Sequence, residues 1–284
     1  MIPFELVEPR SLAEAIALLD PEDTAVRPMS GGTAIMLMMK AGVLRPTRLV
    51  SLARLELDGI EQGPEGELRI GALTRLADIE RSALVRRGWP VIARALRTLS
   101  NVRVRNVARL GGHLAHGDPH TDLPPLLSAL GARVAVAGAR GERVLSVEAL
   151  YAGYLETTLK KDELITAVEI PALAGRAAYL KCTTRSADDW PALGVAVAFD
   201  YGGEAIGSPR LFISAATDRP TRLAAAEKVL AGRPLNEETL REAGAAAAGE
   251  AEIESDLHGS AAYKKQLIRV YVKRAIHEAL RESR

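Results

Sequence analysis

Two double-glycine turns are the segments of this sequence best suited to holding a ligand through the backbone. They read Ser30-Gly31-Gly32-Thr33 and Leu110-Gly111-Gly112-His113, and each is expected to follow a strand. Glycine lets a backbone approach a ligand closely, and successive N–H groups can surround an anion. The helix expected after Thr33 would also favour a phosphate at its N-terminus. A single Gly-Gly pair is more often an ordinary tight turn, but two pairs in the same context favour a phosphate site.

Other motifs for nucleotide binding or hydrolysis are missing from the sequence. It contains neither G-x-G-x-x-G nor a Walker A loop, which disfavours an ordinary Rossmann dinucleotide site. It also lacks the G-x-S-x-G elbow and the H-E-x-x-H helix of known hydrolases, so no motif supports a hydrolase function.

A cluster of polar residues follows the second glycine turn: His113, His116, Asp118, His120 and Asp122. Histidine and aspartate are good metal ligands, so a metal site is one interpretation. We favour a loop whose polar residues bind backbone, phosphate or ribose, because the sequence offers no second cluster. Asp122 could bind a hydroxyl or cap the helix that it begins, since both roles use the same carboxylate oxygens. No metal ligand is therefore assigned.

The composition limits what these groups can do. The chain has 284 residues, 48% of them hydrophobic and 26% charged, with a formal net charge of +1. These values are typical of a soluble globular protein of two domains and argue against a partner nucleic acid. The single cysteine, Cys182, excludes an internal disulfide and an iron–sulfur cluster held by this chain alone. The N-terminus lacks a signal-peptide pattern and no apolar run could insert in a membrane, so a cytoplasmic location is expected.

The elements that must position the turns follow from apolar periodicity and capping signals. A capping box, Ser11 to Glu14, begins a first helix. Strands expected over 25–29 and 48–52 flank a helix over 34–40, which makes a β-α-β-type unit. Four more strands are expected over 67–72, 132–137, 143–147 and 164–170. Helices are expected over 74–80 with Thr74 as cap, over 89–99, and from Asp122 to about residue 131.

Pro171 to Gly175 is the best candidate for a domain boundary. Beyond it, strands expected over 177–183, 193–200 and 210–215 precede helices expected over 221–231, 236–248 and 260–281. Strands followed by helices are typical of an α+β domain.

Several short segments, taken in order, resemble the FAD-binding (medium) subunits of the molybdenum hydroxylases. This is the group of xanthine dehydrogenase, carbon monoxide dehydrogenase and nicotine dehydrogenase. The segments are 30–33 with 38–40, Arg103 with 106–119, 122–124, 168–171, Lys181 with Arg185 and 188–189, and 259–263. The resemblance implies an α+β fold with a two-subdomain FAD-binding domain of vanillyl-alcohol-oxidase (PCMH) type, over 1–55 and 56–174. A smaller C-terminal α+β domain, over 175–284, would contain a three-stranded antiparallel sheet with helices.

The resemblance also implies FAD as cofactor, with its diphosphate between the two glycine segments. The first segment would supply Pro28, Met29, Ser30, Gly31, Gly32, Thr33, Ala34 and Ile35. The second would supply Arg109, Leu110, Gly111, Gly112 and His113. Further contacts are expected at Leu99, His116 and Asp118, and Asp122 would bind the ribose or diphosphate side. Ile165, or Thr166 beside it, would pack on the flavin ring, and Lys181 would lie near the isoalloxazine, where a positive charge favours the reduced flavin.

Three of these positions depart from the family pattern. Arg109 stands where Thr or Ser is common, His113 where Asn or Ser is frequent, and Leu99 where relatives can have an aromatic residue. The changes leave backbone contacts to phosphate possible and alter the side-chain contacts.

The resemblance implies an oxidoreductase subunit that has no catalytic acid or base of its own. It would pass electrons from iron–sulfur clusters through FAD to an external acceptor. The implied partners are a small [2Fe-2S] subunit and a large molybdopterin subunit, assembled as a dimer of heterotrimers. Two alternatives stay open: a self-contained flavin oxidoreductase of the same fold, and a scaffold subunit that has lost FAD.

Overall fold

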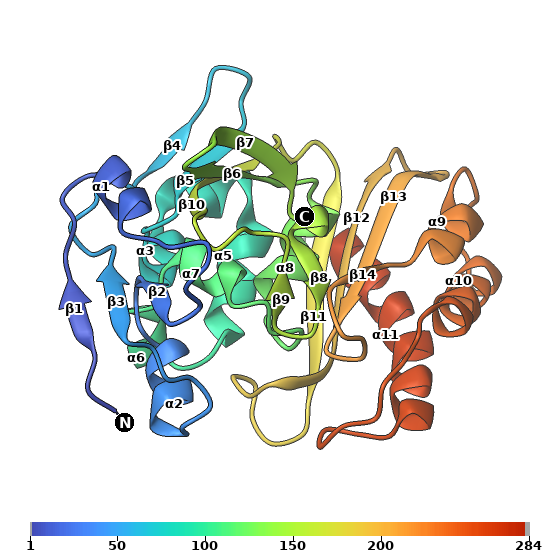
Figure 1. Cartoon of the computed structure of the whole chain (residues 1–284). Helices are drawn as coiled ribbons and strands as arrows, with labels where there is room; N and C mark the ends of the chain where they lie inside the picture. Colours follow the sequence, from blue (N-terminus) through green and yellow to red (C-terminus); the bar gives the residue numbers. More distant parts are fainter. Residues whose placement is uncertain (1, 282–284) are drawn as a thin grey trace.

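The computed structural model describes residues 2–281, which form three larger β-sheets and one two-stranded ribbon (Figure 1). The first sheet is parallel and orders β1 (Glu5–Val7), β3 (Arg48–Ser51) and β2 (Val26–Met29). Its helices are α1 (Leu12–Ala17) and α2 (Ile35–Lys40). The predicted capping box is confirmed, because Ser11 Oγ accepts the N–H of Glu14 at 3.1 Å. The predicted β-α-β-type unit is also confirmed, with α2 connecting the parallel strands β2 and β3.

The second sheet is antiparallel and has the order β4-β5-β10-β6-β7. Its strands are β4 (Ile60–Gln62), β5 (Leu68–Gly71), β10 (Leu164–Ile170), β6 (Arg133–Gly138) and β7 (Gly141–Ser146). The segment between β5 and β6 forms the short helices α3 (Leu76–Arg81), α4 (Ala83–Gly88), α5 (Pro90–Thr98), α6 (Val102–Arg105), α7 (Leu110–Ala115) and α8 (Leu123–Ala129). The helices labelled in Figure 1, α3 and α5 to α8, lie below the sheet in that view. A 3-10 turn (Glu148–Leu150) leads to the ribbon of β8 (Tyr151–Gly153) and β9 (Glu156–Thr157). One core joins sheet and helices through buried apolar residues such as Ile70, Leu96, Leu126 and Val168.

The third sheet has four antiparallel strands, not the three that we predicted. These are β11 (Arg176–Thr183), β12 (Pro191–Tyr201), β13 (Ile206–Ser214) and β14 (Thr221–Arg222). Thr221 and Arg222, expected at the start of a helix, instead pair with Ile213 and Phe212. The helix α9 (Ala224–Leu230) begins only after this pairing ends, followed by α10 (Glu237–Glu250) and α11 (Ala261–Arg281).

The third sheet is shared between two cores. Ala196 and Phe212 belong to the core of the second sheet, whereas Val195 and Ile213 pack in a core with α9, α10 and α11. This follows from the alternation of side chains along a strand, which sends neighbours to opposite faces. In Figure 1 the sheet stands between the central helices and the orange-to-red helices of the C-terminal segment. The three sheets fall within the segments predicted as 1–55, 56–174 and 175–284, and those boundaries stay predictions.

The predicted cap at Thr74 is wrong. Its hydroxyl accepts the N–H of Gly59 and donates to the carbonyl of Gly59, both at 3.0 Å. The residue at the start of α3 is Arg75, which makes no side-chain cap. The Thr74 hydroxyl oxygen therefore binds the main chain of Gly59, which is distant in sequence, instead of capping α3. None of the helices described between residues 2 and 281 has the length and apolar character needed to cross a lipid bilayer.

Candidate functional site

The first double-glycine turn follows β2, as predicted, and presents an uninterrupted run of unpaired donors. Gly32 has φ +74°, a left-handed conformation that glycine adopts without strain. Within residues 2–281 no protein group accepts a hydrogen bond from the main-chain N–H groups of Gly31, Gly32, Thr33, Ala34 and Ile35. A run of N–H groups that turns through a left-handed residue makes a concavity for an anion. This segment therefore has the donors that a phosphate requires.

The second double-glycine segment differs from its prediction. It follows α6 and a turn instead of a strand, and Gly111 and Gly112 lie in the first turn of α7. The N–H of Leu110 donates to Thr74 O at 3.1 Å, and that of Gly111 donates to Ala72 O at 2.7 Å. These long-range bonds use two donors of the helix N-terminus. Among the described residues, no acceptor faces the N–H of Gly112, which leaves it available.

The two glycine segments pack directly against each other. A Cβ on Gly112 would lie 2.3 Å from Ser30 Oγ, and a Cβ on Gly31 would lie 2.4 Å from Val107 O. The contact at Gly31 is with the main chain, so this position needs glycine, whereas the Ser30 hydroxyl that faces Gly112 can rotate away. The unpaired N–H groups of 31–35 and of Gly112 therefore belong to two segments that are in contact at one junction, and their binding of a diphosphate stays a prediction.

A cavity of about 180 Å³ adjoins this junction. It is lined by Ser30, Ala53, Leu55, Asp58, Leu73, Arg75 and Arg109. The guanidinium of Arg109 donates to Leu73 O at 2.7 Å, which holds it against the cavity wall. Burial, and next the charge of Arg75, lower the pKa of Arg109. An isolated β-bridge pairs Arg75 with Arg109 and so places Arg75 at this cavity. The sequence reasoning missed Arg75, because no local sequence pattern indicates that pairing.

Residues of β10 border the junction from the second sheet. Thr166 O accepts the N–H of Ala72 at 3.0 Å, and Ala72 in turn packs against Gly111. The hydroxyl of Thr166 donates to Ala135 O at 3.2 Å. Ile165 is buried in the core of the second sheet. The role expected for Ile165 or Thr166 at the flavin ring stays a prediction.

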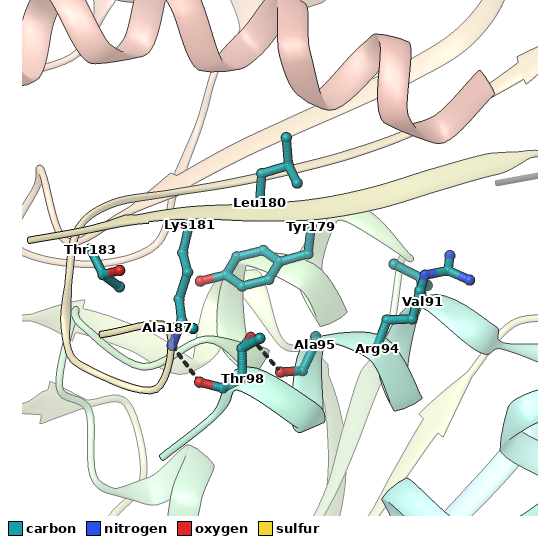
Figure 2. A pocket seen from close by; sticks show the side chains of 9 residues that line it. All are labelled: Val91, Arg94, Ala95, Thr98, Tyr179, Leu180, Lys181, Thr183 and Ala187. Carbon is teal, nitrogen blue, oxygen red and sulfur yellow. Dashed lines mark hydrogen bonds between the residues drawn. The ribbon is translucent and has the colours of Figure 1, made fainter. Parts of the chain in front are cut away.

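Lys181, on β11, belongs to a buried cluster at the contact between the second and third sheets. Its Nζ donates to Thr98 O at 2.7 Å, to Asp122 Oδ2 at 3.2 Å and to Asp189 O at 3.2 Å. An ammonium has three protons, so every donor of Lys181 has a protein acceptor. Figure 2 shows the Lys181 side chain extending to Thr98 at the end of α5, while Leu180 points to the opposite face of the strand. The role expected for Lys181 near the flavin ring stays a prediction.

Asp122 does not cap α8, although its position before the helix suggested this role. It accepts a hydrogen bond from the hydroxyl of Tyr179 at 2.6 Å, and its expected contact with the ribose or diphosphate side of FAD stays a prediction. Burial raises the pKa of Asp122, and the neighbouring Lys181 and Tyr179 only partly oppose that effect. Burial, and next the charge of Asp122, raise the pKa of Tyr179. Tyr179 and Lys181 are two residues apart on β11, and such residues point to the same face of a strand. Strand periodicity could therefore have identified Tyr179 as a neighbour of Lys181.

A cavity of about 250 Å³ opens beside this cluster (Figure 2). Its walls come from α5 and β11 and include Val91, Ala95, Thr98, Tyr179 and Lys181. Leu99, a predicted FAD contact, directly follows α5 and is buried in the core of the second sheet. Its carbonyl accepts a hydrogen bond from the Arg105 guanidinium at 3.1 Å.

Several polar side chains of the loop between α7 and α8 contact other side chains of the protein. His120 contacts Asp118 at 3.0 Å through Nδ1 and Asp256 at 3.1 Å through Nε2. His116 lies 3.9 Å from Asp118. His113 Nε2 is buried without a hydrogen-bond partner, and burial lowers the pKa of His113 to about 4. In the described part of the chain, no three His, Cys, Asp or Glu side chains are arranged to hold a metal ion.

The predicted contacts thus fall into two groups. One surrounds the glycine junction and contains residues of 28–35 and 109–113, with Thr166 at its border. The other surrounds Lys181 and Asp122. His116 and Asp118 lie on the loop that connects the two groups. The contacts of these residues with FAD stay predictions.

The sequence matches two protein families that together cover most of the chain. Residues 2–173 match the FAD binding domain in molybdopterin dehydrogenase, and residues 178–279 match the CO dehydrogenase flavoprotein C-terminal domain. The glyceraldehyde dehydrogenase medium chain of Sulfolobus acidocaldarius is 32% identical over 276 residues, which cover 97% of this chain and 98% of that protein. The carbon monoxide dehydrogenase medium chain of Hydrogenophaga pseudoflava is 31% identical, with 98% of each chain covered.

Solved structures show the same similarity over nearly the whole chain. A chain of carbon monoxide dehydrogenase from Hydrogenophaga pseudoflava superposes with a TM-score of 0.94 at 32% identity, covering 99% of both chains. A chain of quinoline 2-oxidoreductase from Pseudomonas putida 86 superposes with a TM-score of 0.92 at 27% identity, covering 99% of this chain and 98% of that one. The mixed α/β chain therefore belongs to the family of FAD-binding subunits of molybdenum hydroxylases of the carbon monoxide and xanthine dehydrogenase type, and is an oxidoreductase flavoprotein subunit with FAD as its cofactor.

Proposed function

We propose that this chain is the electron-transfer subunit of a molybdenum-containing hydroxylase or dehydrogenase. It receives electrons from iron–sulfur clusters on a partner subunit and delivers them to an external acceptor. The observation that carries the proposal is the junction of unpaired N–H groups, from Gly31 to Ile35 and at Gly112, which fits the diphosphate of FAD. When bound, FAD supplies the redox chemistry, because a flavin can take up and release electrons.

The chain's own residues hold and tune the cofactor. The backbone N–H groups of 31–35 and of Gly112 bind the diphosphate. Lys181 contributes a fixed positive charge, because its ammonium is held by three acceptors and cannot turn away. A fixed charge near the flavin ring favours the reduced cofactor electrostatically. The described residues contribute no acid or base to this role.

We further propose a small [2Fe-2S] subunit and a large molybdopterin subunit as partners, in a dimer of heterotrimers. The single cysteine supports this division, because a cluster needs several thiolates that this chain lacks. The names of similar proteins, medium chain and medium subunit, also describe members of larger assemblies. The parallel first sheet and the antiparallel second sheet support the two-subdomain PCMH type of FAD domain. A cytoplasmic location remains our expectation.

The proposal is tested by producing the chain together with the subunits encoded beside its gene. We expect the purified assembly to show flavin and iron–sulfur absorption, and to release FAD on denaturation. Substrate should bleach the flavin band in the assembly but not in the chain alone. A monomeric chain that oxidises substrate without iron or molybdenum would instead identify the self-contained flavin enzyme. An active assembly without extractable flavin would contradict the proposal and favour the scaffold.

A further inference from the structure

Residues 75–109, which span the helices α3 to α6, carry an excess of positive charge. They contain nine arginines, no lysine and two acidic residues, Asp78 and Glu80, whereas the formal net charge of the whole chain is only +1. Glu80 is already neutralised by Arg105, whose Nε lies 3.0 Å from Glu80 Oε2. Six of the nine arginines are exposed. This segment therefore presents to its surroundings a positive charge that its own acidic residues do not balance.

Three of the exposed arginines, Arg81, Arg86 and Arg103, are gathered where α3, α4 and α6 meet. Arg86 Nε donates to Glu80 O at 2.9 Å, and Arg81 Nη2 donates to Asn106 Oδ1 at 3.4 Å. Arg103 lies three residues before Asn106 at the same helix, and within residues 2–281 its side chain makes no hydrogen bond or ion pair. Neutral groups thus position two of these guanidinium groups, and none of the three is paired with a carboxylate.

Val102 and Val107 add an apolar component to this surface, with exposed fractions of 51% and 48%. The arginine face, as we call it, consists of Arg81, Arg86, Arg103, Val102 and Val107. Exposed arginines around a small apolar area are typical of a protein-binding surface, because arginine is enriched at interfaces. The only aromatic residue of 75–109, Trp89, is buried, so the face lacks a platform on which the bases of a nucleic acid stack.

The arginine face lies close to residues that are expected around FAD. Arg105, on the same helix α6, donates through Nη1 to the carbonyls of Leu99 at 3.1 Å and Ser100 at 2.6 Å. Leu99 is a predicted contact of the cofactor. After α6, Val107 O lies against the first glycine segment, 2.4 Å from the position of a Cβ on Gly31. Because electron transfer weakens steeply with distance, a surface this close to the cofactor suits a protein that collects its electrons.

The composition of the face distinguishes a transient partner from a permanent one. Interfaces of permanent complexes are large and more apolar, whereas complexes between redox proteins are often small and short-lived. Opposite charges on the two surfaces accelerate the encounter of such proteins. Val102 and Val107 are the exposed large apolar residues within 75–109, which are too few for a permanent interface.

We propose that the arginine face is the docking surface for the external electron acceptor, and that this acceptor is an acidic one-electron carrier protein. The assignment rests on the proposed function, in which electrons leave FAD for such an acceptor. Each acceptor molecule takes one electron, so two of them in turn reoxidise one two-electron reduced FAD, whose two protons pass to solvent. Each reduced acceptor then dissociates, because a small, charge-based contact holds it only weakly.

Two haem proteins of opposite charge serve as probes: the soluble domain of cytochrome b5, which is acidic, and cytochrome c, which is basic. The full-length chain with FAD bound is photoreduced without oxygen and mixed with each probe, and haem reduction is followed by stopped-flow absorbance. Binding of each oxidised probe is measured separately by calorimetry. The rate and affinity for cytochrome b5 should fall by about tenfold or more between low and high salt, whereas those for cytochrome c should not fall.

Arg103→Gln is the cleanest variant, because this side chain makes no contact on which folding depends. Arg103→Gln, Arg81→Gln and Arg86→Gln should each lower the rate and affinity for cytochrome b5 at low salt by roughly threefold, and the triple variant by about tenfold or more. Arg103→Lys keeps the charge and should behave like the wild type.

Arg241→Gln is the matched control. Arg241 is an exposed arginine of α10, it has no ion pair within residues 2–281, and α10 lies far from α3 and α6 in Figure 1. This variant should bind and reduce cytochrome b5 like the wild type. An equal loss in Arg241→Gln and Arg103→Gln would overturn the proposal, because the probe would then respond to the overall charge of the chain and not to this face.

Unchanged binding and reduction of cytochrome b5 in the triple variant would overturn the docking surface, while FAD bound to that chain would leave the proposed cofactor role intact. A wild-type chain that holds no FAD would overturn the proposed function, and the role of the face with it. If the triple variant failed to assemble with the proposed partner subunits but still reduced cytochrome b5 at the wild-type rate, the face would belong to a permanent interface. That result would also overturn the proposal.

Discussion

The ammonium of Lys181 lies 3.2 Å from the carboxylate of Asp122, and both side chains are almost entirely buried. Removing one member of such a pair leaves the other charge buried and unpaired, which costs about 3–5 kcal/mol. Lys181→Met, which keeps the length of the side chain, should therefore lower the free energy of unfolding by about that amount. Urea denaturation followed by circular dichroism measures it.

The double variant Lys181→Met with Asp122→Asn provides the control. A neutral amide replaces the stranded carboxylate, so the double variant should be more stable than Lys181→Met alone. If Lys181→Met unfolded like the wild type, the ammonium would not be compensating the buried charge of Asp122.

The packing of the glycine segments predicts an order of severity among alanine variants. A Cβ at Gly31 meets the main-chain oxygen of Val107, which cannot rotate away, whereas a Cβ at Gly112 meets the movable hydroxyl of Ser30. Gly31→Ala should therefore cost about 1–3 kcal/mol of stability, and Gly112→Ala less. Both should lose flavin during purification, because the phosphate donors shift.

Gly249→Ala is the control for these variants. Gly249 lies within α10 with no atom near an added Cβ, so alanine should leave stability equal or raise it by up to about 1 kcal/mol through helix propensity. Equal stability and flavin content in Gly31→Ala and Gly249→Ala would disprove the close contact of the two segments. Unfolding curves and the ratio of flavin to protein absorbance decide between the outcomes.

His120 predicts a dependence of stability on pH. Burial lowers the pKa of His120, but hydrogen bonds to Asp118 and Asp256 outweigh it, and the net pKa is raised. The protonated ring donates through both nitrogens, so it suits the two carboxylates that it contacts, Asp118 and Asp256. A raised histidine pKa stabilises the fold below the unfolded value of about 6.5, and this contribution is lost as pH rises through the folded value.

The histidines His113 and His116 act in the opposite direction, because burial lowers the pKa of both and their contribution is lost as pH falls. The comparison must therefore use the difference between wild type and His120→Gln. That difference in unfolding free energy should be fully present below about pH 6.5 and should shrink as the pH rises through the raised pKa of His120. A difference independent of pH would show that His120 is neutral in the fold.

The sequence around Thr74 predicts a helix cap, but its hydroxyl binds the main chain of Gly59 instead, and this role can be tested. Thr74→Val keeps the shape but removes the hydroxyl that binds both main-chain groups of Gly59. We expect a loss of about 1–3 kcal/mol in unfolding free energy, because the N–H of Gly59 is left without a partner, while the carbonyl of Gly59 still accepts the N–H of Gly71 at 2.9 Å. Thr74→Ser keeps the hydroxyl and should lose much less. Equal losses in the two variants would indicate that the methyl group matters and not the hydrogen bonds.

Local patterns predicted those parts of the fold whose cause is local. The strand over 164–170 has the predicted bounds because its branched, apolar residues end at Pro171. The cap at Ser11 and the glycine turn after β2 likewise depend on neighbouring residues. The family resemblance added the cofactor, which periodicity alone could not supply.

The features that were missed depend on partners far along the chain. Thr221 and Arg222 were expected in a helix, but they form the strand β14 because they pair with the edge of β13. Gly111 lies in a helix whose first donors are held by residues 72 and 74, and no pattern within 110–115 indicates this. The meeting of Arg75 and Arg109 arises from the same long-range contact.

The alternation of Leu180 and Lys181 on β11 restricts how this part of the chain can change in length. Deleting or inserting one residue within Arg176–Thr183 would exchange the two faces, placing a charge among apolar helices and an apolar side chain beside Asp122. We therefore expect natural length variation to spare this strand. Insertions and deletions should occur instead in the exposed connections over 184–188 and 202–204. These residues pack in neither core, so a change of length there does not move apolar side chains to the wrong face.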